Sequence, residues 1–258
     1  MRTRHFKGVV VCLLMFVLPV EAYTLLDFPS PQSVRAGSYK KWVLDQASPP
    51  ILSMSYAIQS DFLGGLAGAQ TAVTNALTSW DQANTTLRFA AAGYQPVVNS
   101  KANWAAGGHA YEGPGAAAGG TGIGANIDIM SRPSGFTFTD IFNRTVTLSS
   151  TSLAMTVPIS LSNNLLSVDV YLNSSFNWST TGGHYDVQTV VLHELGHALG
   201  LDHPDQAAAR GAANYNPWTH LAGAPVTRTV VMDSGYYPDG INRMLTNDEI
   251  GGLTFLYP

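Results

Sequence analysis

The sequence predicts one domain of mixed α/β (α+β) architecture, in which strands and helices share a single core. Pattern and composition both support this fold class. Short segments alternate between apolar and polar residues as strands do, one segment between them has helical periodicity, and two further helical segments lie toward the C-terminal end. Because 45% of the 258 residues are hydrophobic, the chain can bury a sizeable core.

The first half of the chain is predicted to form a strand, a helix and a second strand. Residues 52–58 alternate as a strand does, and residues 86–90 have the composition of another strand. Between them, residues 71–82 place four apolar side chains at helical spacing: Val73, Ala76, Leu77 and Trp80. From 91 to 125 the chain is rich in Gly and Ala without any period, which predicts a long loop or an insertion.

The second half predicts three strands followed by two helices. The strands are expected over 126–130, 153–159 and 167–172. A helix is expected over 186–200, since Asp186 is a good N-cap residue and Gly200 is suited to end a helix. The segment 246–257 opens with a Thr followed three residues later by a Glu, the signature of a capping box, and predicts a C-terminal helix.

The first 22 residues have the pattern of a secretory signal peptide. A basic head precedes an apolar run of about a dozen residues, and small residues follow at Ala22. That run is shorter than the ~20 apolar residues that a membrane span needs. We therefore expect cleavage after Ala22, a secreted protein, and no membrane association once residues 1–22 are removed. Residues 23–50 then form an N-terminal extension, and residues 51–258 form the domain.

Charge and cysteine content exclude some partners and some kinds of bond. Only 12% of residues are charged and the formal net charge is −4, so nucleic acid is not an expected partner. Cys12 is the only cysteine and lies within the predicted signal peptide, so we expect no disulfide and no thiolate ligand. This lack of disulfides favours a bacterial source. We expect a monomer.

The segment from His193 to His203 carries the chemistry. His193 and His197 are four residues apart, so a helix presents both imidazoles on one face. Gly200 allows the turn that returns His203 to the same ion. Three imidazoles with one open position are the ligand set of a catalytic zinc. Glu194 lies beside two of the ligands, where it can take a proton from a water that the metal activates.

This His-Glu-x-x-His-x-x-Gly-x-x-His pattern resembles the zinc signature of the metzincin metallopeptidases. Further segments are similar to the matrixin, or matrix metalloproteinase-type, branch. Met232 lies where a metzincin has its Met-turn, and residues 245–257 resemble the matrixin closing helix. The resemblance implies a metzincin-like zincin fold: a twisted mixed sheet of about five strands with an antiparallel edge strand, an active-site helix and a C-terminal helix. It also implies Zn²⁺ as cofactor, with structural Ca²⁺ as a further possibility, for which Asp128, Asp140 and Asp169 are candidates.

The same resemblance implies where a substrate binds. The edge strand would pair with an extended peptide through its backbone, over Leu153, Ala154, Met155 and Thr156. A side pocket near the Met-turn would take Ser234, Gly235 and Tyr236 as its wall, although simple turn structure explains these three equally well.

The function expected from these features is that of a secreted zinc-dependent endopeptidase acting on protein or peptide substrates. Two alternatives stay open. The first is a non-catalytic extracellular binding protein on a metzincin scaffold, although such a protein has no chemical need for Glu194. The second keeps the peptidase but directs it at cell-wall peptides.

Overall fold

The fold is described from a computed structural model. It defines residues 24–25, 40–42, 52–84, 86–95, 125–139, 145–161, 164–182, 184–203, 231–232 and 241–258. The predicted signal peptide, most of the predicted extension and residues 96–124 of the predicted insertion lie outside these ranges, as do Asp140, Ser234, Gly235 and Tyr236. Within the described ranges, no helix is both long and apolar enough to span a membrane.

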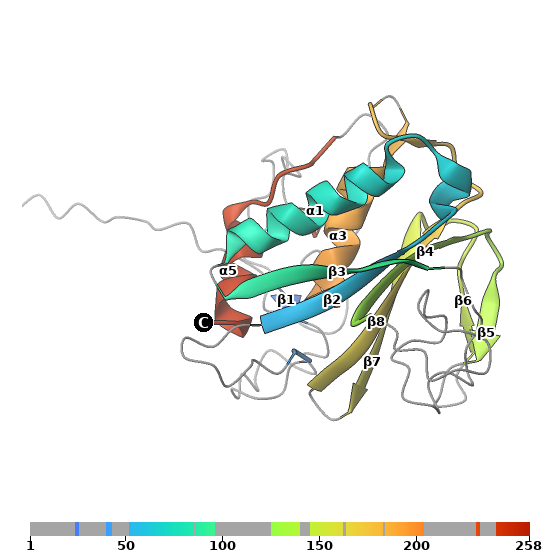
Figure 1. Ribbon diagram of the computed structural model, residues 1–258. Helices are drawn as coiled ribbons and strands as arrows, with labels where there is room; N and C mark the ends of the chain where they lie inside the picture. Colours follow the sequence, from blue (N-terminus) through green and yellow to red (C-terminus); the bar gives the residue numbers. More distant parts are fainter. Residues whose placement is uncertain are drawn as a thin grey trace, which may run out of the picture.

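A five-stranded mixed sheet forms the centre of the domain (Figure 1). Its order is β3-β2-β4-β8-β7, with β2 at Leu52–Gln59, β3 at Leu87–Gln95, β4 at Ile127–Arg132, β7 at Ala154–Leu161 and β8 at Asn164–Asn173. All neighbours are parallel except β7, which runs antiparallel to β8 at the edge. The expected sheet with its antiparallel edge strand is therefore confirmed.

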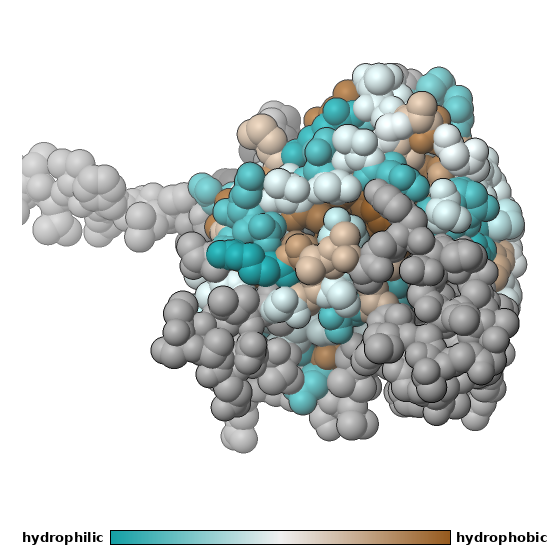
Figure 2. All heavy atoms as spheres, in the orientation of Figure 1, coloured by the Kyte–Doolittle hydropathy of each residue, from teal (hydrophilic) through white to brown (hydrophobic). Residues whose placement is uncertain are grey.

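Two helices cover one face of this sheet (Figure 1). They are α1 at Ala69–Ala83 and α3 at Val187–Ala198, and their apolar residues join those of the sheet in one large core. Trp80 of α1 is fully buried, and its indole N–H donates to the carbonyl of Leu192 in α3 at 2.9 Å. Figure 2 shows hydrophilic residues over the outer side of α1, with hydrophobic residues between this helix and the sheet. The helix that carries the histidines therefore packs against both α1 and the sheet.

A smaller apolar cluster lies on the opposite face. Met130, Leu148, Val157 and Tyr171 are its buried members. The cluster is covered by the short antiparallel strands β5 (Thr137–Thr139) and β6 (Thr145–Thr147), which supply Phe138 and Val146. The sequence does not predict β5 and β6, because three residues are too few to establish an alternating pattern.

The C-terminal helix α5 (Asn247–Leu256) packs at the end of α3, together with residues 40–42. The Thr246–Glu249 capping box is present as predicted. The hydroxyl of Tyr257 donates to the carbonyl of Leu199 at 2.7 Å, and the indole N–H of Trp42 donates to the carbonyl of Ala198 at 2.8 Å. These contacts hold the C-terminal end of α3, where the chain must turn toward His203.

Short elements complete the described chain. They are the 3-10 helix η1 (Phe62–Gly65) and four two-residue strands, β1 (Thr24–Leu25), β9 (Trp178–Ser179), β10 (Tyr185–Asp186) and β11 (Leu201–Asp202). Strand β1 pairs antiparallel with β11, and β9 pairs parallel with β10. The pairing of β1 places Thr24–Leu25 beside the residues that immediately precede His203.

The structure differs from the sequence analysis at the end of β3. The loop was expected from residue 91, but β3 continues to Gln95, where it pairs with Gln59 of β2. The Ala and Gly residues of this segment obscure the alternation on which a strand prediction depends, whereas backbone pairing with β2 does not require large side chains.

Candidate metal centre

Helix α3 begins and ends as its sequence predicts. Asp186 is the N-cap, and its carboxylate accepts the backbone N–H of Thr189 at 2.8 Å. Gly200 follows the helix with a φ of +102°, in the left-handed region that glycine adopts without strain. A side chain at residue 200 would also meet the backbone oxygen of Lys40 at 2.5 Å. The chain can therefore reverse through β11 and bring His203 back over the helix.

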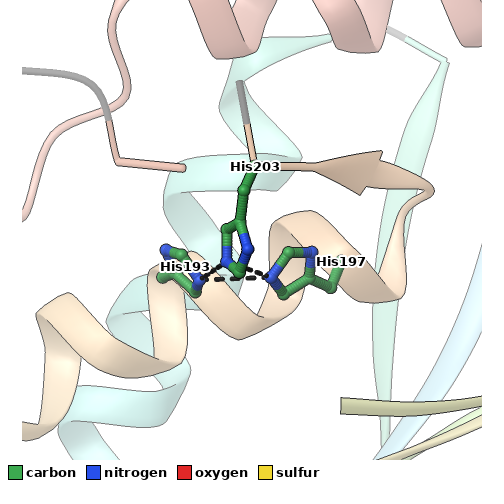
Figure 3. A group of neighbouring side chains, drawn as sticks. All are labelled: His193, His197 and His203. Atoms are coloured by element: carbon green, nitrogen blue, oxygen red, sulfur yellow. Dashed lines mark hydrogen bonds between the residues drawn. The ribbon is translucent and has the colours of Figure 1, made fainter. Parts of the chain in front are cut away.

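The three predicted ligands converge (Figure 3). The Nε2 atom of His193 lies 3.1 Å from Nε2 of His197 and 2.9 Å from Nε2 of His203, and the last two atoms are 2.9 Å apart. Nε2 atoms this close to one another can all reach a zinc ion at the usual Zn–N distance of about 2.0–2.1 Å.

The hydrogen bonds of Nδ1 in His193 and His197 determine whether Nε2 of the same ring carries a proton. Nδ1 of His193 lies 2.7 Å from the carbonyl oxygen of Val231, and Nδ1 of His197 lies 2.8 Å from that of Leu201. A carbonyl only accepts, so both Nδ1 atoms carry the proton and both Nε2 atoms present bare lone pairs. Lone pairs that face each other at 3.1 Å repel unless a cation such as Zn²⁺ or a proton lies between them. The site therefore fits Zn²⁺ bound through neutral imidazoles.

Glu194 lies next to these ligands and is nearly inaccessible to solvent, at 6% exposure. Burial raises the pKa of its carboxyl to about 7, although a hydrogen bond from Thr156 and the nearby His203 oppose the rise. The hydroxyl of Thr156 lies 2.5 Å from Oε2 of Glu194. A carboxylate whose pKa lies near neutrality is suited to take up and release a proton.

Met232 lies beneath the helix that carries the ligands and is 2% exposed. Its backbone N–H donates to Oε1 of Glu249 at 3.1 Å, and the preceding carbonyl, of Val231, contacts His193. Glu249 is itself fully buried and was recognised in the sequence only for its role in the capping box. Its second contact links the C-terminal helix to the Met232 segment, across 17 residues of sequence.

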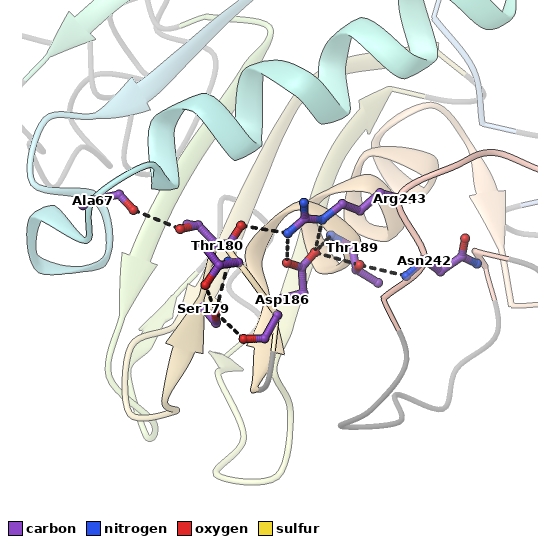
Figure 4. Close-up of polar contacts among 9 residues, drawn as sticks. Ala67, Ser179, Thr180, Asp186, Thr189, Asn242 and Arg243 are labelled. Atoms are coloured by element: carbon purple, nitrogen blue, oxygen red, sulfur yellow. Dashed lines mark hydrogen bonds and ion pairs between the residues drawn. The ribbon is translucent and has the colours of Figure 1, made fainter.

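The start of α3 is held by an ion pair that the sequence analysis did not predict (Figure 4). Arg243 donates to both carboxylate oxygens of Asp186, at 3.1 and 2.5 Å, and to the carbonyl of Thr180 at 2.8 Å. Burial alone would raise the pKa of Asp186, but the hydrogen bonds from Arg243 and Thr189 hold it below its ordinary value. Because Asp186 and Arg243 are 57 residues apart, no local pattern connects them.

The structure describes four of the seven residues expected to bind substrate. Leu153 and Ala154 pack against the main core, while Met155 packs against the smaller cluster on the opposite face. Thr156 directs its hydroxyl at Glu194. The expected pocket wall after Met232 lies outside the described residues.

Two of the carboxylates considered for calcium face each other inside the protein. Asp128 on β4 and Asp169 on β8 are directly paired in register and are 0% and 1% exposed. Asp169 accepts the hydroxyl of Tyr171 at 2.9 Å, while neither oxygen of Asp128 has a partner of full hydrogen-bond geometry in the described part of the chain. Burial and the charge of Asp169 raise the pKa of Asp128, which the backbone N–H of Ala125 offsets only in part.

Two histidines of helix α3 and a third after β11 form a His₃ site, next to a buried glutamate and a five-stranded sheet with one antiparallel edge. This combination defines a zincin-type metallopeptidase centre. The family model for Matrixin matches residues 53–222, so the chain belongs to the matrixin family. Human matrix metalloproteinase-27 is 29% identical to this chain over 89 residues, which are 34% of this chain. That match spans 14% of the length of the human protein.

Proposed function

We propose that this protein is a zinc endopeptidase that hydrolyses peptide bonds in proteins. The observation that carries the proposal is the His193–His197–His203 triad, with two tautomers fixed by carbonyl groups and Glu194 beside it. Zinc bound here would polarise the scissile carbonyl and lower the pKa of a water molecule. Glu194 then accepts the proton of the attacking water and passes it to the leaving amine.

The geometry of β7 supports an extended polypeptide as substrate. The N–H of Asn173 in β8 points toward β7 and bonds to Leu153, whereas the N–H of Val168 points away from β7 and bonds to Asn126. By strand alternation, Ala154 and Thr156 of β7 turn their N–H and C=O groups outward from the sheet. Among the described residues no strand pairs with this edge, so these groups can pair with a substrate strand through its backbone, which places little demand on its sequence.

The same geometry limits the length of that pairing. Pro158 is the next outward-facing residue of β7, and proline has no N–H to donate. At Ala154 and Thr156 a substrate strand can therefore form hydrogen bonds with both the N–H and the C=O of β7. At Pro158 it can bond only to the C=O. We expect short peptides that pair only with Ala154 and Thr156 to be bound nearly as well as longer ones.

The experiment measures zinc content and casein hydrolysis on one purified sample of the secreted protein. We expect about one zinc per chain, with cleavage lost on chelation and restored by zinc. Glu194→Gln should keep zinc and fold but lower kcat by about 10²- to 10⁴-fold. Asp61→Asn, which neutralises an exposed carboxylate on the loop after β2, is the matched control and should retain activity.

Three results would separate the proposal from its alternatives. Full casein cleavage by Glu194→Gln would remove the role assigned to this residue. Zinc without cleavage of any protein or peptide would favour the non-catalytic binding protein. Release of fragments from purified peptidoglycan, with casein left intact, would favour a cell-wall peptidase.

Secretion, the monomeric state and calcium are proposals as well. The basic and apolar pattern of residues 1–22 supports secretion, and the family to which the chain belongs is compatible with it. The buried pair Asp128 and Asp169 supports calcium, because two carboxylates that face each other are stabilised by a cation.

A further inference from the structure

One side chain of the substrate-binding edge contacts the proposed catalytic base. Thr156 is the third residue of β7, and its hydroxyl donates to Oε2 of Glu194 at 2.5 Å across the space between strand and helix. The two residues are 38 positions apart in sequence. We propose that Thr156 is a positioning residue that holds the Glu194 carboxylate for proton transfer, an inference that rests on the proposed peptidase function.

Strand alternation explains why this hydroxyl reaches the site. Met155 and Val157 pack against the cluster on the far face of the sheet, so Ala154 and Thr156 face the helix. Helix α3 packs directly on β7. A hydroxyl at residue 156 is therefore brought to Glu194 by the register of the edge strand alone.

The contact restricts the carboxylate to one orientation. Glu has three rotatable side-chain bonds, and nothing in the sequence of α3 fixes the last of them. With Oε2 bound by Thr156, the carboxylate plane is held and Oε1 is left to accept a proton. Because Glu194 is 6% exposed, solvent contributes little to fixing its position.

Thr156 can form a hydrogen bond with Glu194 whether the Glu194 carboxyl is ionised or protonated. While Glu194 is ionised, the Thr156 hydroxyl donates to Oε2. Once Glu194 has taken the proton from water on Oε1, Oε2 becomes the carbonyl oxygen of the acid and still accepts from the Thr156 hydroxyl, which also lies 3.2 Å from the backbone carbonyl of Glu194. The proton then leaves Glu194 for the leaving amine, and the first arrangement returns. A valine at residue 156 supports neither arrangement.

Thr156 also links a bound substrate strand to the proposed base, Glu194. The backbone of Thr156 faces outward from the sheet, where it is available to the substrate strand, while its side chain holds Glu194. A peptide paired with this residue is therefore in a fixed register relative to the carboxylate. Such a register is the kind of positioning that brings reacting groups together at low entropic cost.

The test compares Thr156→Val and Thr156→Ser in the zinc-loaded full chain, with kcat and KM measured separately on a peptide substrate. We expect Thr156→Val to lower kcat by about 10- to 100-fold, with KM changed by less than about threefold. Thr156→Ser keeps the hydroxyl and should stay within about threefold of wild type. Thr78→Val, which removes an exposed hydroxyl bound to a carbonyl on α1, is the matched control.

Several outcomes would overturn the assignment. Unchanged kcat in Thr156→Val would show that the hydroxyl does not position the base. Equal losses in Thr156→Val and Thr156→Ser would indicate that the shape of the side chain matters rather than its hydroxyl. A loss confined to KM would make Thr156 a substrate contact only. Zinc content is measured for each variant, and loss of zinc would likewise assign the effect to the metal site.

A second measurement does not depend on activity. The chain has four Glu residues, so labelling the side-chain carboxyl carbon of Glu gives at most four NMR signals, and Glu194→Gln identifies the relevant one. In metal-free protein, Thr156→Val should shift the Glu194 signal and Thr156→Ser should largely restore it. An unmoved signal would overturn the contact itself. If wild type proves inactive while this signal responds as expected, the proposed function fails and the contact stands.

Discussion

Met232 lies so close to Gly196 that a Cβ atom added at residue 196 would come within 2.2 Å of its sulfur atom. The same Cβ would meet Trp80 of α1 at 3.2 Å. Gly196 occupies the position before the second helical ligand, His197. The absence of a side chain there is what allows the buried Met232 to lie against the zinc-binding helix.

Gly196→Ala should therefore destabilise the protein even though alanine favours helices. We expect a loss of about 1–3 kcal/mol, because Met232 must move within a packed core. Thermal unfolding of the metal-free protein measures the loss. In a double-mutant cycle, Gly196→Ala should cost less stability in a Met232→Ala background than in wild type, because the smaller side chain removes the clash. A Gly196→Ala protein as stable as wild type would contradict this close packing.

Removing the ion pair between Arg243 and Asp186 should destabilise the start of the zinc-binding helix. Asp186 has no exposed surface, whereas the Arg243 side chain is 33% exposed and its contribution is partly screened. We expect Arg243→Gln to cost about 1–3 kcal/mol near pH 7. Arg88→Gln, which removes an exposed arginine elsewhere, should change stability little. Equal unfolding temperatures for the two variants would contradict the prediction.

The cost of Arg243→Gln should depend on pH in one direction. The pKa of Asp186 is lower in the folded protein than in the unfolded chain, so its stabilising contribution is present above the unfolded value of about 4. That contribution is lost as pH falls through the lower, folded value. The difference in unfolding temperature between wild type and Arg243→Gln should therefore be largest near neutral pH and shrink below about pH 4. A difference that grows in acid would show that another group dominates.

The sequence predicts the parts of the site that depend on local spacing. The ligands His193 and His197, the N-cap Asp186 and the turn at Gly200 follow from helix geometry over a few residues. The five main strands were also predicted, although the end of β3 was not, because Ala and Gly obscure its alternation.

The contacts that complete the site connect residues far apart in sequence. Thr156 meets Glu194, and Glu249 meets Met232, only because packing brings their elements together. A motif states which residue types are present within one helix but not which strand faces it. For this reason the sequence indicated Thr156 as part of the substrate edge and did not indicate its contact with the base.

Neutralising Asp128 should stabilise the metal-free protein at neutral pH. Its pKa is raised in the folded state, so the stability that its protonated form provides is present at low pH and lost as pH rises through the folded value. Asp128→Asn should therefore raise the unfolding temperature at pH 7–8, by roughly 2–6 °C, and change it little near pH 4. Asp61→Asn is the exposed control. Destabilisation by Asp128→Asn at pH 8 in the presence of chelator would contradict this.

Adding calcium tests whether Asp128 and Asp169 together bind a cation. If Asp128 and Asp169 bind this cation, added calcium stabilises the wild type in proportion to its binding. The Asp128→Asn protein lacks one carboxylate and should respond much less. Equal responses of the two proteins would place any calcium site elsewhere, while no response of the wild type would remove calcium from this pair.

The pairing of β1 with β11 predicts that Thr24–Leu25 supports the third zinc ligand. If the chain is cleaved after Ala22 as proposed, Tyr23 is its first residue, which the mass of the secreted protein can verify. Thr24–Leu25 then bonds to Leu201–Asp202, directly before His203. Deleting residues 23–25 should weaken zinc binding by about tenfold or less, measured by competition with a chromophoric chelator. Replacing Thr24 and Leu25 by alanine keeps the backbone pairing and should preserve affinity. Equal affinity of the deletion variant and wild type would show that β1 contributes nothing to the position of His203.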